Sequence, residues 1–77
     1  MMGKSIYTKR HQRLCELLRE ARQRRGLTQQ QLAGKLRRPQ SFIAKYELGE
    51  RRLDVVEFLD VTRGIAVNPC DVLKQID

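Results

Sequence analysis

Two short segments with helical periodicity, residues 29–36 and 40–47, are joined by only three residues, Arg37-Arg38-Pro39. Helices this close along a chain cannot lie straight and antiparallel, so we expect them to cross at a steep angle. Such a crossing needs a small side chain where the two backbones meet, and Ala33 provides one. Ile43 is the apolar side chain that we expect to fill the remaining gap. This link constrains the fold more than any other feature of the chain.

The rest of the sequence also shows helical periodicity, and no segment alternates like a strand, so we predict an all-α fold. The expected helices cover residues 9–25, 29–36, 40–47, 54–64 and 68–76. Two of them begin with a capping box, Thr28 with Gln31 and Asp54 with Glu57. Gly64 is expected to end the fourth helix. The predicted core consists of Leu14, Leu17, Leu18, Ala21, Leu32, Ala33, Leu36, Phe42, Ile43, Tyr46, Val55, Phe58, Leu59, Thr62, Val72, Leu73 and Ile76.

The length of 77 residues allows one domain, which we place at residues 9–77, after a flexible basic arm at residues 1–8. No apolar run approaches the roughly 18 residues of a membrane span. Cys15 and Cys70 are too few for a disulfide scaffold, which favours a reducing cytoplasm and free thiols. His11 is the only histidine and has no partner at metal-ligand spacing. We therefore expect no metal ion, no cofactor, no membrane contact and no enzymatic activity.

The net charge of +7 is unevenly placed along the chain. Residues 1–52 contain 14 of the 16 Lys and Arg but only four of the nine acidic residues. Residues 53–77 are net acidic. This asymmetry is typical of a protein whose first part meets a polyanion, such as nucleic acid.

The outward face predicted for residues 40–47 consists of Gln40, Ser41, Ala44 and Lys45. These side chains are short, amidic or cationic, and none is acidic. A helix with such a face fits the DNA major groove, where Gln can pair with adenine and Lys with guanine, and Ser or Ala can touch a thymine methyl group. We therefore predict that this helix reads base edges and that residues 29–47 form a helix-turn-helix.

Polar and basic residues flank this reading helix on both sides. Gln29 opens the preceding helix, where free backbone N–H groups favour an anion. We expect phosphate contacts from Gln29, Lys35, Arg37, Arg38, Arg51 and Arg52. A protein that straddles two sugar-phosphate strands needs cations in this arrangement.

Two stretches resemble the Cro/repressor-type (Xre-like) helix-turn-helix regulators. The first is Gly26-Leu27-Thr28-Gln29-Gln30-Gln31-Leu32-Ala33, and the second runs through residues 39–53 and contains Tyr46-Glu47-Leu48-Gly49-Glu50-Arg51. The resemblance covers about residues 11–74. It implies a compact five-helix, lambda-repressor-like domain that binds a palindromic operator as a homodimer. It also implies a phosphate contact by Gln29, base contacts by Gln40, Ser41 and Lys45, and an Arg22–Glu47 ion pair.

The chain departs from the resembled pattern at Arg37, which occupies a turn position where glycine is usual. A left-handed residue other than glycine costs about 1–2 kcal/mol, so either Arg37 tolerates that conformation or the turn is built differently. Pro39, near the expected cap of the next helix, has no side-chain acceptor.

From these features we predict a transcription regulator, most simply a repressor, that binds double-stranded DNA as a homodimer. The dimer contact is expected around Val61, Ile65, Val67, Cys70 and Leu73, although these residues could equally be core. The alternative is a protein-interaction module, such as an antitoxin that binds a toxin, with DNA binding secondary. A third and weaker alternative is RNA binding, which no aromatic stacking face supports.

Overall fold

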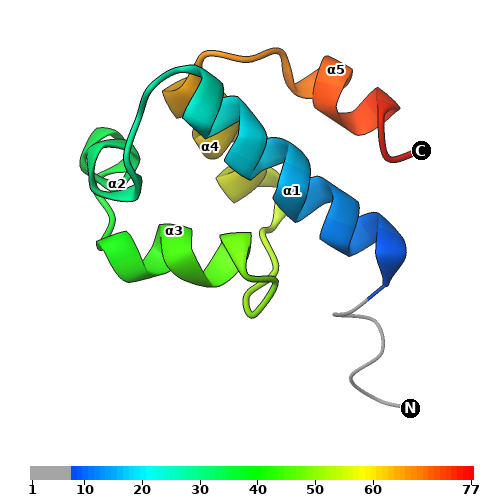
Figure 1. Cartoon of the computed structure of the whole chain (residues 1–77), viewed down its shortest axis with the longest axis horizontal. Coiled ribbons are helices and arrows are strands. Elements are labelled where there is room, and N and C mark those ends of the chain that lie inside the picture. The colour runs from blue at the N-terminus through cyan, green and yellow to red at the C-terminus, as the bar shows by residue number, and fades with distance from the viewer. Residues whose placement is uncertain (1–7) are drawn as a thin grey trace.

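The structure, a computed structural model, describes residues 8–77. The predicted basic arm lies outside the described residues except for Thr8, whose hydroxyl caps the first helix by accepting the His11 N–H. Five helices follow in order, and residues 8–77 contain no strand (Figure 1). They are α1 (Lys9–Arg24), α2 (Gln29–Leu36), α3 (Gln40–Glu47), α4 (Val55–Ile65) and α5 (Pro69–Lys74). None of the helices in this part of the chain is long and apolar enough to span a bilayer.

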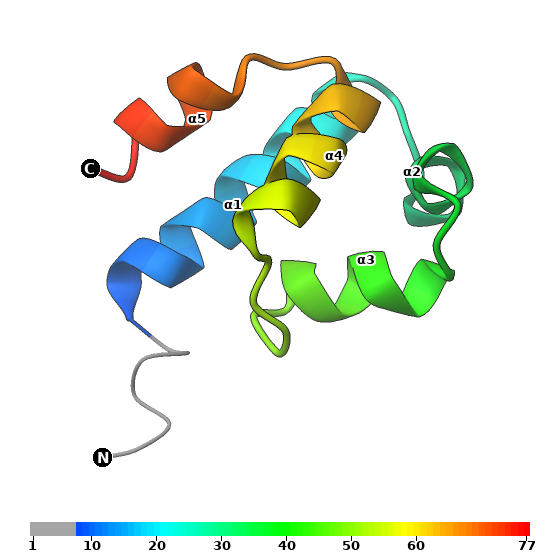
Figure 2. The same cartoon turned by 180° about the vertical axis from the view of Figure 1, so that it is seen from behind.

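Helix α1 runs through the middle of the molecule and contacts α3, α4 and α5 (Figures 1 and 2). Helices α2 and α3 form a corner at one end, and α4 packs against both α1 and α2. Helix α5 lies on the other side of α1 from α3 (Figure 1). The corner formed by α2 and α3 is therefore supported from behind and leaves the far side of α3 uncovered.

The core consists of apolar side chains from all five helices. Its buried members are Leu17, Leu18, Ala21, Leu32, Ala33, Phe42, Ile43, Tyr46, Phe58, Val61, Ile65 and Val72. Val61 and Ile65 are 0% and 1% exposed, so of the two alternatives left open for them, dimer contact or core, the structure supports the core. Val55 and Leu59, predicted as core, are 74% and 43% exposed. Helix α4 is rotated from its predicted orientation because Val61 and Ile65 fill the space beneath α1 and α2.

Four helices end in the same local structure, a left-handed residue followed by an N–H that bonds five residues back. Gly26 and Gly49 adopt this conformation after α1 and α3, and Arg37 and Ala66 adopt it after α2 and α4. The returning N–H groups belong to Leu27, Arg38, Glu50 and Val67. The turn at Arg37 is thus left-handed, with φ 57° and ψ 43°. Pro39 precedes α3 without a side-chain cap.

Gly64 does not end the fourth helix, contrary to prediction, because α4 continues to Ile65 and Ala66 supplies the left-handed residue. The role of Gly64 is instead a close approach between helices. A Cβ at this position would lie 2.9 Å from Leu32 Cδ1 and 3.0 Å from Leu36 Cδ2. Glycine therefore allows α4 to pack closely against α2.

Candidate nucleic-acid interface

Helix α3 has one buried face and one solvent-facing face. Phe42, Ile43 and Tyr46 point into the core. Gln40, Ser41 and Lys45 are exposed, and Ala44 is partly exposed. The carboxylate of Glu47, the one acidic residue of α3, belongs to a side chain only 3% exposed. The solvent-facing side of the helix therefore presents amide, hydroxyl, methyl and ammonium groups without a carboxylate.

The corner between α2 and α3 has the packing that the short link demands. Ala33 is 3% exposed and Ile43 is fully buried. Gly34 lies on the outer side of α2, where no atom stands within 4 Å of the place that a Cβ would occupy. The first turn of α2 is closed by a capping box, in which Thr28 Oγ1 accepts the Gln31 N–H at 3.0 Å and Gln31 Oε1 accepts the Thr28 N–H at 2.8 Å.

Arg22 and Glu47 form an ion pair that fastens α1 to the end of α3. Arg22 Nε donates to Glu47 Oε2 at 2.7 Å and Nη2 donates to Oε1 at 3.0 Å. Arg22 Nη1 also donates to the Leu27 carbonyl at 2.8 Å. The two side chains are 10% and 3% exposed. The hydrogen bonds that Arg22 donates to Glu47 raise the pKa of Arg22 against the opposing effect of burial, so the guanidinium stays charged.

A chain of hydrogen bonds leads from this ion pair to the exposed start of α3. Gln29 Nε2 donates to Glu47 Oε1 at 2.9 Å, and Gln40 Nε2 donates to Gln29 Oε1 at 2.6 Å. The predicted phosphate contact and the predicted adenine contact are thus directly bonded to each other. The orientation of the Gln40 amide is set by a carboxylate that the core holds in place.

The flanking cations fall into two groups. Lys35, Arg37 and Arg52 are exposed, and no ion pair within 4.0 Å is found for them among residues 8–77. Arg38 and Arg51 are each 38% exposed in their side chains and both contact Glu57 of α4. The six predicted phosphate contacts therefore come from the start of α2, from its end and the turn that follows, and from the loop between α3 and α4.

Sequence reasoning assigned Glu57 only its role in the capping box and missed its contact with the two arginines. The capping role is present, because Asp54 accepts the Glu57 N–H and Glu57 accepts the Asp54 N–H. Hydrogen bonds from Arg51 are the main reason that the pKa of Glu57 falls to about 2. The sequence offers no signal for these contacts, because Arg38, Arg51 and Glu57 lie in three separate segments.

His11 and Cys15 form a second buried polar contact, beside the loop after α3. His11 is 7% and Cys15 is 6% exposed, and Cys15 Sγ lies 3.7 Å from His11 Nε2. Burial raises the pKa of the Cys15 thiol, which keeps it protonated and unreactive. Cys70 is exposed and also free. Within residues 8–77 no three His, Cys, Asp or Glu side chains cluster in a way that could hold a metal ion.

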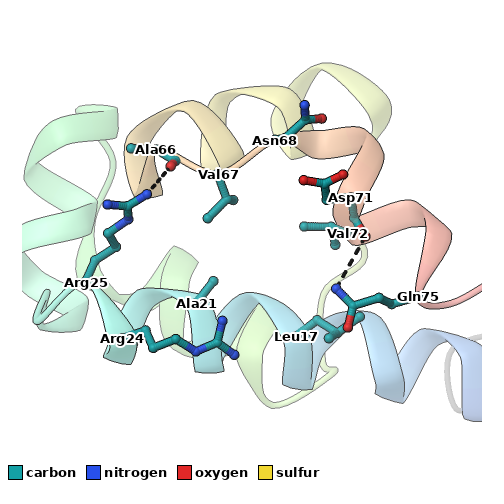
Figure 3. Close-up of a pocket in the computed structure, with 10 residues that line it drawn as sticks. All are labelled: Leu17, Ala21, Arg24, Arg25, Ala66, Val67, Asn68, Asp71, Val72 and Gln75. Atoms are coloured by element: carbon teal, nitrogen blue, oxygen red, sulfur yellow. Dashed lines mark hydrogen bonds between the residues drawn. The ribbon is translucent and has the colours of Figure 1, made fainter.

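A cavity of about 390 Å³ lies between α1, α5 and the loop before α5, and its lining includes the apolar residues Leu17, Ala21 and Val72. Figure 3 shows the side chains that line it. Arg25 donates to the Ala66 carbonyl at 2.6 Å along one edge. None of the predicted base or phosphate contacts lines this cavity. The polar surface around α3 is therefore a separate feature of the molecule.

The geometry of α2 and α3 has counterparts among known proteins. Residues 13–73 match the family model of a helix-turn-helix domain. The solved XRE-family like protein from Pseudomonas syringae pv. tomato str. DC3000 is 50% identical with a TM-score of 0.86, covering 96% of this chain and 90% of that one. A single-residue mutant of the restriction-modification controller protein C.Esp1396I is similar in fold, with 20% identity, a TM-score of 0.81 and coverage of 90% and 87%. No curated protein gives a match.

Proposed function

The chain belongs to the XRE-like helix-turn-helix family, and from this premise we propose that it binds double-stranded DNA sequence-specifically through α3. It acts as a non-enzymatic transcription regulator, most simply a repressor that occupies a palindromic operator as a homodimer. The observation that carries the proposal is the acid-free outer face of α3, surrounded by cations and supported by the Gln40–Gln29–Glu47 hydrogen bonds. Each part of this surface has a complementary group on duplex DNA.

The amide of Gln40 is suited to an adenine edge. One of its two Nε2 hydrogens is donated to Gln29, and the other N–H and the carbonyl oxygen remain for adenine N7 and N6. Lys45 lies on the same face and provides an ammonium group for guanine. Ser41 and Ala44 are small enough to let the helix approach a thymine methyl group. The face therefore favours mixed A·T and G·C half-sites.

The phosphate contacts come from groups on both sides of α3. Gln29 stands at the start of α2, where the N–H groups and the positive end of the helix dipole attract an anion. Lys35, Arg37 and Arg38 supply cations from the segment before α3, and Arg51 and Arg52 supply cations from the loop after it. Because these contacts release counterions, binding should weaken as salt increases, with a slope of about −0.9 for each phosphate neutralised.

Dimerisation follows from the size of the reading surface. One eight-residue helix covers about half of a regulatory site, and two reading helices separated by about 34 Å would meet successive turns of one DNA face. With Val61 and Ile65 in the core, we assign the contact to the exposed apolar side chains Val55, Val56 and Leu59 of α4. These lie in the acidic part of the chain, where two copies of a basic protein repel each other least.

Selection of bound duplexes from a random pool tests the proposal in one experiment. We expect an enriched palindromic site, and we expect Gln40→Ala and Lys45→Ala each to cost about 1–3 kcal/mol on that site and to relax its sequence. Arg51→Ala should weaken binding to cognate and random DNA alike and make the salt slope shallower by about one. An affinity for duplex DNA that changes neither with these substitutions nor with salt concentration would contradict the proposal. A stoichiometric protein partner that survives nuclease treatment would favour an interaction module instead.

A further inference from the structure

One carboxylate connects the two basic segments on either side of α3. Glu57 Oε1 accepts from Arg51 Nη1 at 2.9 Å, and Oε2 accepts from Arg51 Nη2 at 2.8 Å. Arg38 Nη1 lies 3.4 Å from the same Oε2. The Glu57 side chain is only 12% exposed. Arg38 belongs to the turn before α3 and Arg51 to the loop after it, so Glu57 reaches cations from both flanks of the reading helix.

The ring of Phe42 completes this cluster. The guanidinium carbon of Arg38 lies 4.4 Å from the ring centroid, and that of Arg51 lies 4.8 Å from it. Phe42 is itself buried in α3, 6% exposed, and stands edge-on to Tyr46 with centroids 5.6 Å apart. Both arginines are therefore held by charge at one point and by an aromatic surface at another, and both points are rigid parts of the fold.

We propose that Glu57 is a positioning residue for DNA binding, which orders Arg38 and Arg51 side by side so that their remaining N–H groups meet the phosphates of one backbone segment beside α3. This inference rests on the proposed function. An Arg side chain has five N–H donors, and Arg51 makes three hydrogen bonds within the protein, two to Glu57 and one to the Arg52 carbonyl. Donors thus remain for a phosphate. Ordering the side chain before DNA arrives lowers the entropy lost on binding.

A purely electrostatic role for Glu57 predicts the opposite result. A carboxylate beside a polyanion repels it, so removing that charge should strengthen DNA binding. A positioning role predicts weaker binding, because two long side chains become disordered when their shared anchor is lost. The sign of the change in affinity therefore distinguishes the two roles.

Glu57→Gln is the test variant, because it removes the charge while keeping a carbonyl oxygen for the Asp54 N–H of the capping box. We expect its affinity for the selected site to fall about fivefold or more, the cost of ordering two side chains on binding. The salt slope should become shallower by about one to two, as contacts are lost. Asp60→Asn, an exposed acid on the same helix, makes the matched charge change and should bind DNA as tightly as the natural chain or tighter.

Glu57→Gln is also made in a chain that carries Arg38→Ala and Arg51→Ala. If Glu57 acts only through these arginines, its substitution should lose its effect on DNA affinity there, whereas a general loss of stability would lower affinity in both chains. Without the two arginine side chains, Glu57→Gln should no longer weaken DNA binding. It should strengthen binding slightly, because the only remaining effect of Glu57 is repulsion of the phosphates. Thermal unfolding of each variant checks that it is folded at the temperature of the binding measurements. If Glu57→Gln binds as tightly as the natural chain or tighter in the natural background, the inference is overturned. If the natural chain binds no duplex at all, the proposed function fails first.

Discussion

Single residues deep in the fold set the direction of groups at its surface. Glu47 accepts hydrogen bonds from Arg22 and from Gln29, and Gln29 in turn accepts from Gln40. A carboxylate that is 3% exposed thereby orients an exposed amide two hydrogen bonds away. The ion pair accordingly has two roles, since it fastens α1 to α3 and also orders the groups proposed to read DNA.

Breaking the pair on one side should be costly. We expect Arg22→Met to lower the free energy of unfolding by about 3–5 kcal/mol, because it leaves the Glu47 carboxylate buried without its cation. The double variant Arg22→Met/Glu47→Leu should lose less than the single one, since no lone charge remains. Urea denaturation of both variants measures the difference. A double variant less stable than the single one would contradict this account.

His11 gives the fold a dependence on pH near neutrality. Burial, assisted by the positive charge of Arg52, lowers the pKa of His11 below its ordinary value of 6.5, against a smaller raising effect from a backbone hydrogen bond at Gly49. The unfolded chain then binds the proton more strongly than the native chain. The contribution to stability is full above pH 6.5 and is lost as the pH falls below it.

The melting temperature should therefore fall between about pH 7.5 and pH 5.5, and His11→Gln should flatten that fall. The Glu57 carboxylate does not interfere, because its contribution is lost only as the pH drops below its ordinary pKa of 4.5 towards about 2. Differential scanning calorimetry across this range checks the expectation. A slope unchanged in the variant would assign the pH dependence to other groups.

At the scale of elements, α1 to α4 each end in a left-handed residue, which is glycine in two cases and a residue with a side chain in the other two. After α1 and α3 the left-handed position is glycine, and after α2 and α4 it is Arg37 and Ala66. A residue with a Cβ costs about 1–2 kcal/mol in this conformation. At Arg37 the strained residue places a cation beside α3. At Ala66 the carbonyl oxygen accepts a hydrogen bond from the Arg25 guanidinium.

Comparing Arg37→Gly with Arg37→Ala separates the effect of backbone strain at this turn from the effect of the lost positive charge. We expect Arg37→Gly to raise the free energy of unfolding by up to about 1 kcal/mol, since relief of left-handed strain exceeds the entropy that glycine loses on folding. Arg37→Ala keeps the strain and should leave stability near its natural value. Both substitutions remove the same cation, so both should weaken DNA binding equally. Thermal unfolding and a DNA titration measure these quantities separately.

The elements that the sequence predicts well are those defined by local chemistry. The bounds of α2 and α3 follow from Thr28, from the short link and from the apolar stripe of Phe42, Ile43 and Tyr46. Helix α4 was rotated in the prediction because its apolar residues Val55, Phe58, Leu59, Val61 and Ile65 almost surround the helix. Only the space left by α1 and α2 decides which of them are buried.

The candidate site divides in the same way. The outward positions of Gln40, Ser41 and Lys45 follow from the helical period once Phe42 and Ile43 are taken as core. The contacts of Glu57 with Arg38 and Arg51 do not follow, because they join residues from three segments that meet only in the folded chain. Periodicity places a residue on a face but does not select its partner across space.

At the scale of the whole molecule, most of the exposed large apolar side chains belong to α4. The large hydrophobic residues exposed among residues 8–77 are Leu48, Val55, Val56, Leu59 and Leu73. Three of these belong to α4, beside the acidic residues Asp54 and Asp60. This face suits the dimer contact that we propose, because the acidic residues beside it offset part of the repulsion between two basic chains.

We expect Val56→Glu to abolish self-association, because two copies would then bury like charges against each other. Leu73→Glu places the same charge on α5 and should leave association unchanged. Sedimentation in the absence of DNA measures both variants at micromolar concentration. Dissociation by Leu73→Glu and not by Val56→Glu would move the contact to α5. If the natural chain sediments as a monomer, the proposed dimer is contradicted.

The missing side chain at Gly64 has a consequence for how this molecule can change. Because α4 approaches Leu32 and Leu36 so closely, even a methyl group there would force the ends of these two side chains, which lie on α2, to shift. Under the proposed function, the placement of α3 against DNA depends on this contact between α2 and α4, whereas the choice of bases depends on the exposed side chains of α3. New specificities can then arise by exchanging those exposed side chains alone, without rebuilding the frame that carries them.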